Sequence, residues 1–180
     1  VVLPTMSRLI AAGDAPAAMR EQNRAIAMTV VLAMPFVAAF LTMPDLLVKA
    51  LFGRGAFDAR AAETAASVLF AYALGLIPVL LIRSVVASFF ARGDTTTPVI
   101  ASLTALALNV VLKIVFVGPL GAAGLALATA IGAWINFGIL YALALRRGWT
   151  KPGDVLAKAL IVSFAGAIAF EIAILILRDP

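Results

Sequence analysis

Long runs of residues without a charge constrain this chain more than any other feature. Residues 25–44, 64–82 and 95–112 form three such runs, and residues 155–177 contain only Lys158 and Glu171 as charged positions. At a rise of about 1.5 Å per residue, some 20 residues in a helix cross the ~30 Å hydrocarbon core of a bilayer. Runs of this length and composition predict membrane-spanning helices.

A further charge-free run, residues 114–145, is too long for one straight span and contains the turn sequence Gly118-Pro119-Leu120-Gly121. The sequence therefore predicts an all-α polytopic membrane protein with about five complete transmembrane helices, preceded by the end of another. The helices are expected at residues 23–51, 61–91, 97–117, 121–146 and 154–177, and residues 1–12 are expected to end a preceding span. Barrel strands are excluded because the runs are continuously apolar instead of alternating.

Composition narrows the function classes. Hydrophobic residues make up 64% and charged residues 13%, against roughly 45–50% and about 25% in soluble domains. The absence of cysteine and histidine excludes disulfides, cysteine-type zinc sites and histidine bases. Without paired carboxylates or a glycine-rich phosphate loop, we expect no enzyme, no metal site and no cofactor. The net charge of +5 has no basic stripe with interleaved aromatics, so we expect no nucleic-acid partner.

Basic residues are distributed unevenly between alternate loops. One set of loops and helix ends holds Arg8, Arg20, Arg24, Arg92, Arg146, Arg147, Lys151 and Lys158. The opposite set holds Lys49, Arg54, Arg60 and Arg178. Because positive residues are retained on the cytoplasmic side, the first set is predicted to face the cytoplasm.

Two arginines lie at positions that suit either anchoring or ligand binding. Arg83 precedes Arg92 by nine residues, which places it about 13 Å deeper along a helix. A charge at such depth is costly, so Arg83 either snorkels to the surface or faces a wet cavity. Arg24 opens the first complete helix, where it serves as an ordinary cytoplasmic anchor or projects into a cavity mouth.

Polar residues also mark two neighbouring spans. Asn109 and Lys113 are four residues apart and share a helix face, as do Thr129 and Asn136 on the following helix. A hydrogen bond between Asn109 and Thr129 would join the helices, or the stripe would line a hydrated path for an anionic group. Both interpretations are open from the sequence.

Small residues and prolines predict close packing and bends. Gly124, Ala128 and Gly132 form a small-xxx-small face, which favours close helix packing over a direct role in binding. Pro35 and Pro78 lie inside predicted helices, where each removes a backbone hydrogen bond and is expected to kink its helix, either statically or as a hinge.

Five segments in this order and spacing resemble the MurJ/MviN family of lipid II flippases, within the multidrug/oligosaccharidyl-lipid/polysaccharide exporter superfamily. They are Leu3-Pro4-Thr5-Met6-Ser7-Arg8, Leu51-Phe52-Gly53-Arg54-Gly55-Ala56-Phe57-Asp58, Ala71-Tyr72-Ala73-Leu74-Gly75-Leu76, Phe89-Phe90-Ala91-Arg92-Gly93-Asp94-Thr95-Thr96-Thr97-Pro98 and Gly118-Pro119-Leu120-Gly121-Ala122-Ala123-Gly124-Leu125-Ala126-Leu127-Ala128-Thr129. The resemblance covers residues 1 to about 150, and residues 151–180 match only in hydropathy.

The resemblance implies a fold and an activity. Family members have two six-helix lobes and two extra helices, and this chain would be most of the C-terminal lobe, with the N-terminal lobe missing. They move lipid II, an undecaprenyl-pyrophosphate-linked peptidoglycan precursor, across the bacterial inner membrane by alternating access of a cationic cavity. Another exporter of the superfamily, or a membrane scaffold without transport, are the alternatives. A drug-cation exporter is disfavoured because Glu171 is the only acid deep within a span.

The resemblance also bears on single residues. Arg83 matches a basic position kept by relatives, and Arg24 lies near the family's cavity arginine. With Asn109 and Lys113 they form the expected substrate-binding set. Some relatives hold sodium between the helices of Asn109 and Thr129, but Lys113 stands where an acidic ligand would be expected. We hypothesise that its ammonium group replaces the charge of the ion.

Overall fold

The computed structural model describes residues 2–54 and 58–150, and the helix predicted over 154–177 lies outside this part. The described residues form helices joined by short connections: α1 (Val2–Ala11), α2 (Ala15–Thr42), α3 (Pro44–Phe52), α4 (Ala59–Phe90) and α5 (Thr96–Arg146). Among these, α2, α4 and α5 are long and apolar enough to cross a membrane. The predicted class, an all-α polytopic membrane protein, is confirmed.

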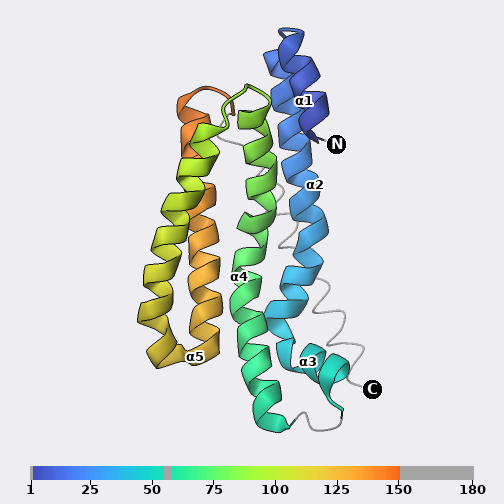
Figure 1. Cartoon of the computed structure of the whole chain (residues 1–180). Helices are drawn as coiled ribbons and strands as arrows, with labels where there is room; N and C mark the ends of the chain where they lie inside the picture. The colour runs from blue at the N-terminus through green and yellow to red at the C-terminus, as the bar shows by residue number, and fades with distance from the viewer. Residues whose placement is uncertain (1, 55–57, 151–180) are drawn as a thin grey trace, which may run out of the picture.

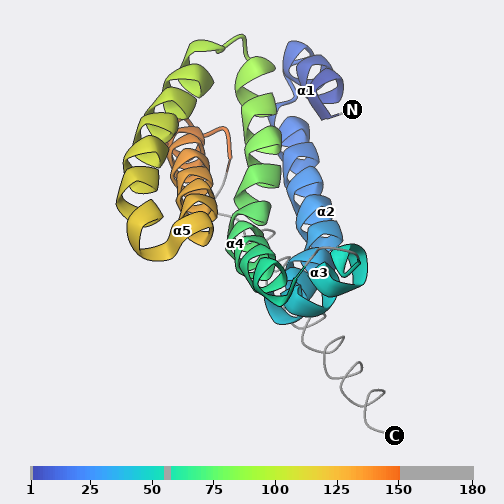
Figure 2. The ribbon, with the colours of Figure 1, turned by 60° about the horizontal axis from the view of Figure 1, so that its bottom comes forward.

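The 51 residues of α5 form a helical hairpin. Its backbone leaves helical geometry at Gly121, where φ is 55° and ψ is −133°, a conformation that glycine adopts without a Cβ clash. The first leg runs toward the lower end of the bundle in Figure 1, and the second returns beside it, as Figure 2 also shows. Two helices separated by a turn at residues 118–121 were predicted, and the hairpin has this form.

The predicted small-residue face packs within this hairpin. A Cβ at Gly124 would lie 2.3 Å from the carbonyl oxygen of Phe116, and one at Gly132 would lie 2.9 Å from Nδ2 of Asn109. Ala128 is fully buried. These positions therefore allow the second leg to approach the first, which confirms the packing interpretation.

The single helix predicted over residues 23–51 starts too late and misses a break, because the structure has two helices here. Helix α2 begins at Ala15, where the Asp14 side chain accepts a hydrogen bond from the Ala17 amide, as an N-cap residue does. It ends at Thr42, and α3 starts separately at Pro44. The break follows from proline, which lacks an amide hydrogen and disfavours helical geometry at the preceding Met43.

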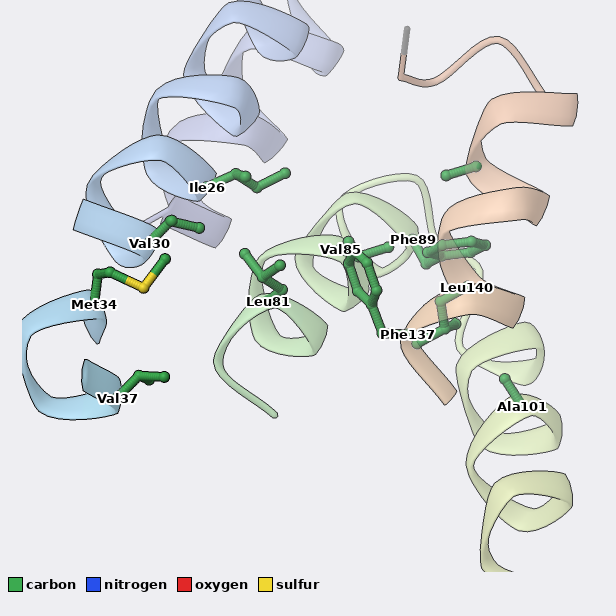
Figure 3. Packing of buried hydrophobic residues seen from close by; sticks show 11 residues of the cluster. Ile26, Val30, Met34, Val37, Leu81, Val85, Phe89, Ala101, Phe137 and Leu140 are labelled. Carbon is green, nitrogen blue, oxygen red and sulfur yellow. The ribbon is translucent and has the colours of Figure 1, made fainter. Parts of the chain in front are cut away.

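The core lies along α4, which Figure 1 places between α2 and α5. Figure 3 shows side chains from the three helices meeting there. The buried cluster comprises Ile26, Val30, Met34 and Val37 of α2, Leu81, Val85 and Phe89 of α4, and Ala101, Phe137, Leu140 and Ala144 of α5. At the middle of α4, a Cβ at Gly75 would lie 2.6 Å from Cα of Ala130, so α4 and α5 approach closely there.

The two prolines predicted to lie inside helices do so, Pro35 in α2 and Pro78 in α4. Because residue 78 has no amide hydrogen, the carbonyl of Leu74 loses its usual partner four residues later. The indole Nε1 of Trp134 in α5 donates to this carbonyl at 2.9 Å. The proline therefore supplies an acceptor that ties α4 to α5.

The loops gather at two ends of the bundle. Figure 1 places the α1–α2 and α4–α5 connections and the end of α5 at one end, and α3 and the hairpin turn at the other. The first end carries the six basic residues of the predicted cytoplasmic set that the structure describes, namely Arg8, Arg20, Arg24, Arg92, Arg146 and Arg147. We call it the basic end.

Candidate functional site

Two grooves flank α4. The apolar groove, between α2 and α4, has a volume of about 440 Å³ and is lined by Thr29, Leu32, Ala33, Phe36, Phe40, Leu76 and Leu80. The polar groove, between α4 and the α5 hairpin, has a volume of about 360 Å³. Its lining residues are Val79, Ile82, Ser102, Ala105, Leu106, Asn109, Lys113, Thr129, Gly132, Ala133 and Asn136.

Arg83 lies on α4 between the two grooves. It is exposed and follows Val79 of the polar groove by four residues and Leu80 of the apolar groove by three. Residues at these spacings share one helix face, so Arg83 projects from the face of α4 that borders both grooves. We call this the grooved face. The end of α4 is seven residues away at Phe90, about 10 Å along the helix.

Asn109 joins the two legs of the hairpin at the polar groove. Its Nδ2 donates to the backbone carbonyl of Ala128 at 3.2 Å, and Gly132 provides the space for its side chain. The predicted side-chain bond between Asn109 and Thr129 is not the one formed, because the Thr129 hydroxyl donates to the carbonyl of Leu125 within its own helix. The expected connection between the helices is therefore made to the backbone.

The rest of the polar groove offers unpaired hydrogen-bonding groups. Asn136 donates from Nδ2 to the Ser102 hydroxyl at 3.4 Å, while its Oδ1 is buried and has no partner in the part of the chain that the structure describes. Lys113 is half-buried and forms no ion pair within the described residues. A cation next to amide and hydroxyl groups suits an anionic or hydroxyl-rich ligand. Ser102 was not singled out from the sequence, because a serine in an apolar helix gives no signal of its own.

Arg24 is placed apart from the other three predicted site residues. It is exposed and shares its face of α2 with Met28 and Val31, four and seven residues later, which are also exposed. The lining of the apolar groove comes from other positions of α2. The structure thus brings Asn109 and Lys113 together, places Arg83 on the same side of α4, and leaves Arg24 away from them.

A third cavity, of about 510 Å³, lies between α3, α4 and the hairpin turn. Its walls are mainly apolar, and the charged residues that line it are the acids Asp45 and Glu63. Without a cation, it does not suit a phosphate-bearing ligand as the grooved face does.

A cluster at the basic end was not predicted from the sequence. The Asp94 carboxylate forms an ion pair with Arg147, 53 residues later, and accepts bonds from the amide and hydroxyl of Thr97 at 3.0 and 2.7 Å. These hydrogen bonds, those from Thr97 first, lower the pKa of Asp94 from 3.8 to about 2. The cluster ties the α4–α5 connection to the end of α5 and keeps Asp94 ionised.

The model of the family described as lipid II flippase MurJ matches residues 1–178 of the chain. A probable lipid II flippase MurJ from Rhizobium meliloti (strain 1021) is 34% identical over 169 residues, covering 93% of this chain and 32% of the relative. The lipid II flippase MurJ of Burkholderia cenocepacia is 30% identical over 152 residues, covering 84% of this chain and 30% of the relative.

A solved structure of lipid II flippase MurJ in an inward closed conformation has the same fold. It superposes with a TM-score of 0.73 at 24% identity and covers 92% of this chain and 36% of that one. The chain spans about a third of the length of the curated relatives it matches. The match of the family model over nearly all residues shows that the chain belongs to the MurJ lipid II flippase family.

Proposed function

We propose that this chain forms most of the C-terminal lobe of a lipid II flippase in the bacterial cytoplasmic membrane. The complete protein would carry lipid II from the inner to the outer leaflet by alternating access, supplying cell-wall synthesis. A missing N-terminal lobe of the same protein would face the grooved face and close the cavity. Family membership and the limited share of the relatives that the chain covers support this division.

The grooved face has the chemistry that such a substrate requires. Lipid II carries a pyrophosphate and a large polar head group, which must pass through hydrocarbon. A guanidinium group recognises phosphate oxygens through two parallel hydrogen bonds, and Arg83 presents one between the two grooves. Its exposure, and its shared face with Val79 and Leu80, is the observation that carries the proposal.

The other residues have separate roles in this proposal. Lys113 adds a second cation within the polar groove, where Asn109 and Asn136 present amide groups for the head group. Binding and transport are the proposed functions, with no chemical step catalysed by the chain. Arg24, which lines neither groove, is assigned to anchoring at the anionic lipid surface, the alternative that the sequence left open.

A matched pair of variants tests the proposal in the full-length protein. Arg83→Ala and Arg24→Ala each remove one guanidinium group from an exposed position, on α4 and on α2. The two variants therefore lose the same charge and differ in where it was. We expect Arg83→Ala to lower lipid II translocation in proteoliposomes at least about tenfold, the value of one charge-assisted bidentate contact. Arg24→Ala should retain translocation within about twofold.

Complementation of flippase-depleted cells provides the second readout. Cells that rely on Arg83→Ala should lyse, although the protein reaches wild-type levels in the membrane, while cells with Arg24→Ala should grow. Normal growth and translocation with Arg83→Ala would remove the substrate role and favour a scaffold. Wild-type transport of a different polysaccharide-lipid, with none of lipid II, would favour another exporter of the superfamily.

A further inference from the structure

Two arginines of the basic end converge on a single aromatic ring. The guanidinium carbon of Arg92 lies 4.8 Å from the ring centroid of Trp149, and that of Arg147 lies at the same distance. The ring in turn packs edge-on against Phe89, with centroids 5.1 Å apart. The two cations are therefore less than about 10 Å apart on one aromatic ring, away from the residues that line the grooves.

The charges of this cluster do not balance. Arg147 is paired with Asp94, whose carboxylate is also engaged by both donors of Thr97. Arg92 has no carboxylate partner among the described residues, and its Nη1 donates to the backbone carbonyl of Ser88 at 2.8 Å. A guanidinium has five N–H donors, so most of those on Arg92 are free to bind an anion.

Arg92 is also held where water only partly solvates it. Burial lowers the pKa of the Arg92 guanidinium below its usual value, although the group stays charged. A partly desolvated cation without an acidic partner is stabilised when an anion approaches. The carboxylate of Asp94 is already engaged by Arg147 and Thr97, so an anion that pairs with Arg92 would come from outside the described residues.

The position of the cluster selects the kind of anion. Arg92 lies two residues beyond the end of α4, and Trp149 three beyond the end of α5, both of which are candidate membrane spans. Tryptophan and arginine at span ends are typical of the headgroup layer. An anion at this depth is the phosphodiester of a phospholipid, and its acyl chains would run along the exposed apolar residues of α5, such as Val99 and Ile100.

We propose that Arg92, supported by Trp149 and Arg147, binds the phosphodiester headgroup of an anionic phospholipid of the inner leaflet. The site lies at the basic end, apart from the grooved face, and does not depend on the identity of the transported lipid. It accounts for the Arg92-Gly93-Asp94 connection: Asp94 holds the end of α5 in place, and Arg92 is left free for the lipid.

Native mass spectrometry of the full-length protein in detergent, titrated with dioleoyl phosphatidylglycerol, tests the proposal. We expect wild type to bind the first phosphatidylglycerol about tenfold more tightly than phosphatidylcholine. Arg92→Gln should lose this preference. Arg20→Gln, which removes an exposed arginine from the same end of the bundle, should keep it. Equal preference in wild type and in folded Arg92→Gln would overturn the proposal.

Two further measurements test whether the guanidinium group recognises a lipid and not a soluble anion. Arg92→Lys keeps the charge and a donor for the Ser88 carbonyl but loses the bidentate fork, so the affinity for phosphatidylglycerol should fall about threefold. Affinity equal to wild type in this variant would contradict recognition by the guanidinium. Inorganic phosphate at millimolar concentration should not displace the lipid, and complete displacement would show a site for soluble anions instead.

Discussion

The hydrogen bond from Trp134 to the carbonyl of Leu74 provides the sharpest test of how this bundle is held together. Because residue 78 is proline, this carbonyl has no amide donor four residues later in α4, and Nε1 of Trp134 donates to it at 2.9 Å. Within the membrane no water replaces a lost donor. Trp134→Phe should therefore leave the Leu74 carbonyl without this donor. It keeps an aromatic ring next to Phe137, whose ring centroid lies 6.2 Å from that of Trp134 in the native structure.

A double-mutant cycle isolates this bond from the change in packing. Pro78→Ala restores an amide hydrogen that the Leu74 carbonyl can accept within α4. Trp134→Phe should cost about 1–2 kcal/mol more in the native background than in the Pro78→Ala background. Equilibrium unfolding of the full-length protein in mixed micelles measures the four free energies. Additivity within about 0.5 kcal/mol would refute the reasoning, because independent sites behave in that way.

Three further predictions follow from other contacts. Gly75→Ala should lower the free energy of unfolding by about 1–3 kcal/mol, because its Cβ would lie 2.6 Å from Cα of Ala130; Gly138→Ala, with no atom within 4 Å of the new Cβ, should raise it by up to about 1 kcal/mol. The pKa of Asp94 is held at about 2, below its usual 3.8. The ionised carboxylate therefore contributes fully to the free energy of unfolding above about pH 4, and this contribution is lost as the pH falls toward 2. The thermal midpoint of the wild type should therefore fall between about pH 4 and about pH 2, and this fall should be smaller in Asp94→Asn. Identical pH profiles of the two proteins would contradict the prediction. Replacing potassium by sodium should leave the thermal midpoint of the full-length protein unchanged, because Lys113 supplies the positive charge in the polar groove, and stabilisation specific to sodium would contradict that role.

Hydropathy and turn chemistry predicted most of the helical architecture. Most residues of each charge-free run in the described part of the chain lie in α2, α4 or α5, and the glycine at position 121 marks the hairpin turn. The prediction failed at Met43 and Pro44, where hydropathy continues but the backbone cannot. It also began α2 too late, because the helix extends through polar residues such as Arg20 to its cap at Asp14.

The candidate site was predictable only as a set of unusual residues. Arg83, Asn109 and Lys113 stand out in the sequence because polar groups within spans are costly. Their grouping depends on the rotation of each helix about its axis, which hydropathy does not specify when a helix is apolar on every side. Arg24 shows the consequence, since it is exposed on α2 and lines neither groove.

Local composition and backbone hydrogen bonding along each segment are enough to predict that this protein is helical and lies in a membrane. Which residues meet depends on the three-dimensional packing of the helices. Gln22 is fully buried, and neither polar atom of its side-chain amide has a hydrogen-bond partner among the described residues. Asp94 and Arg147 pair across 53 residues, and Trp134 donates to the carbonyl that Pro78 leaves without an amide donor. Such contacts depend on how helices pack, and packing is a property of their surfaces in combination.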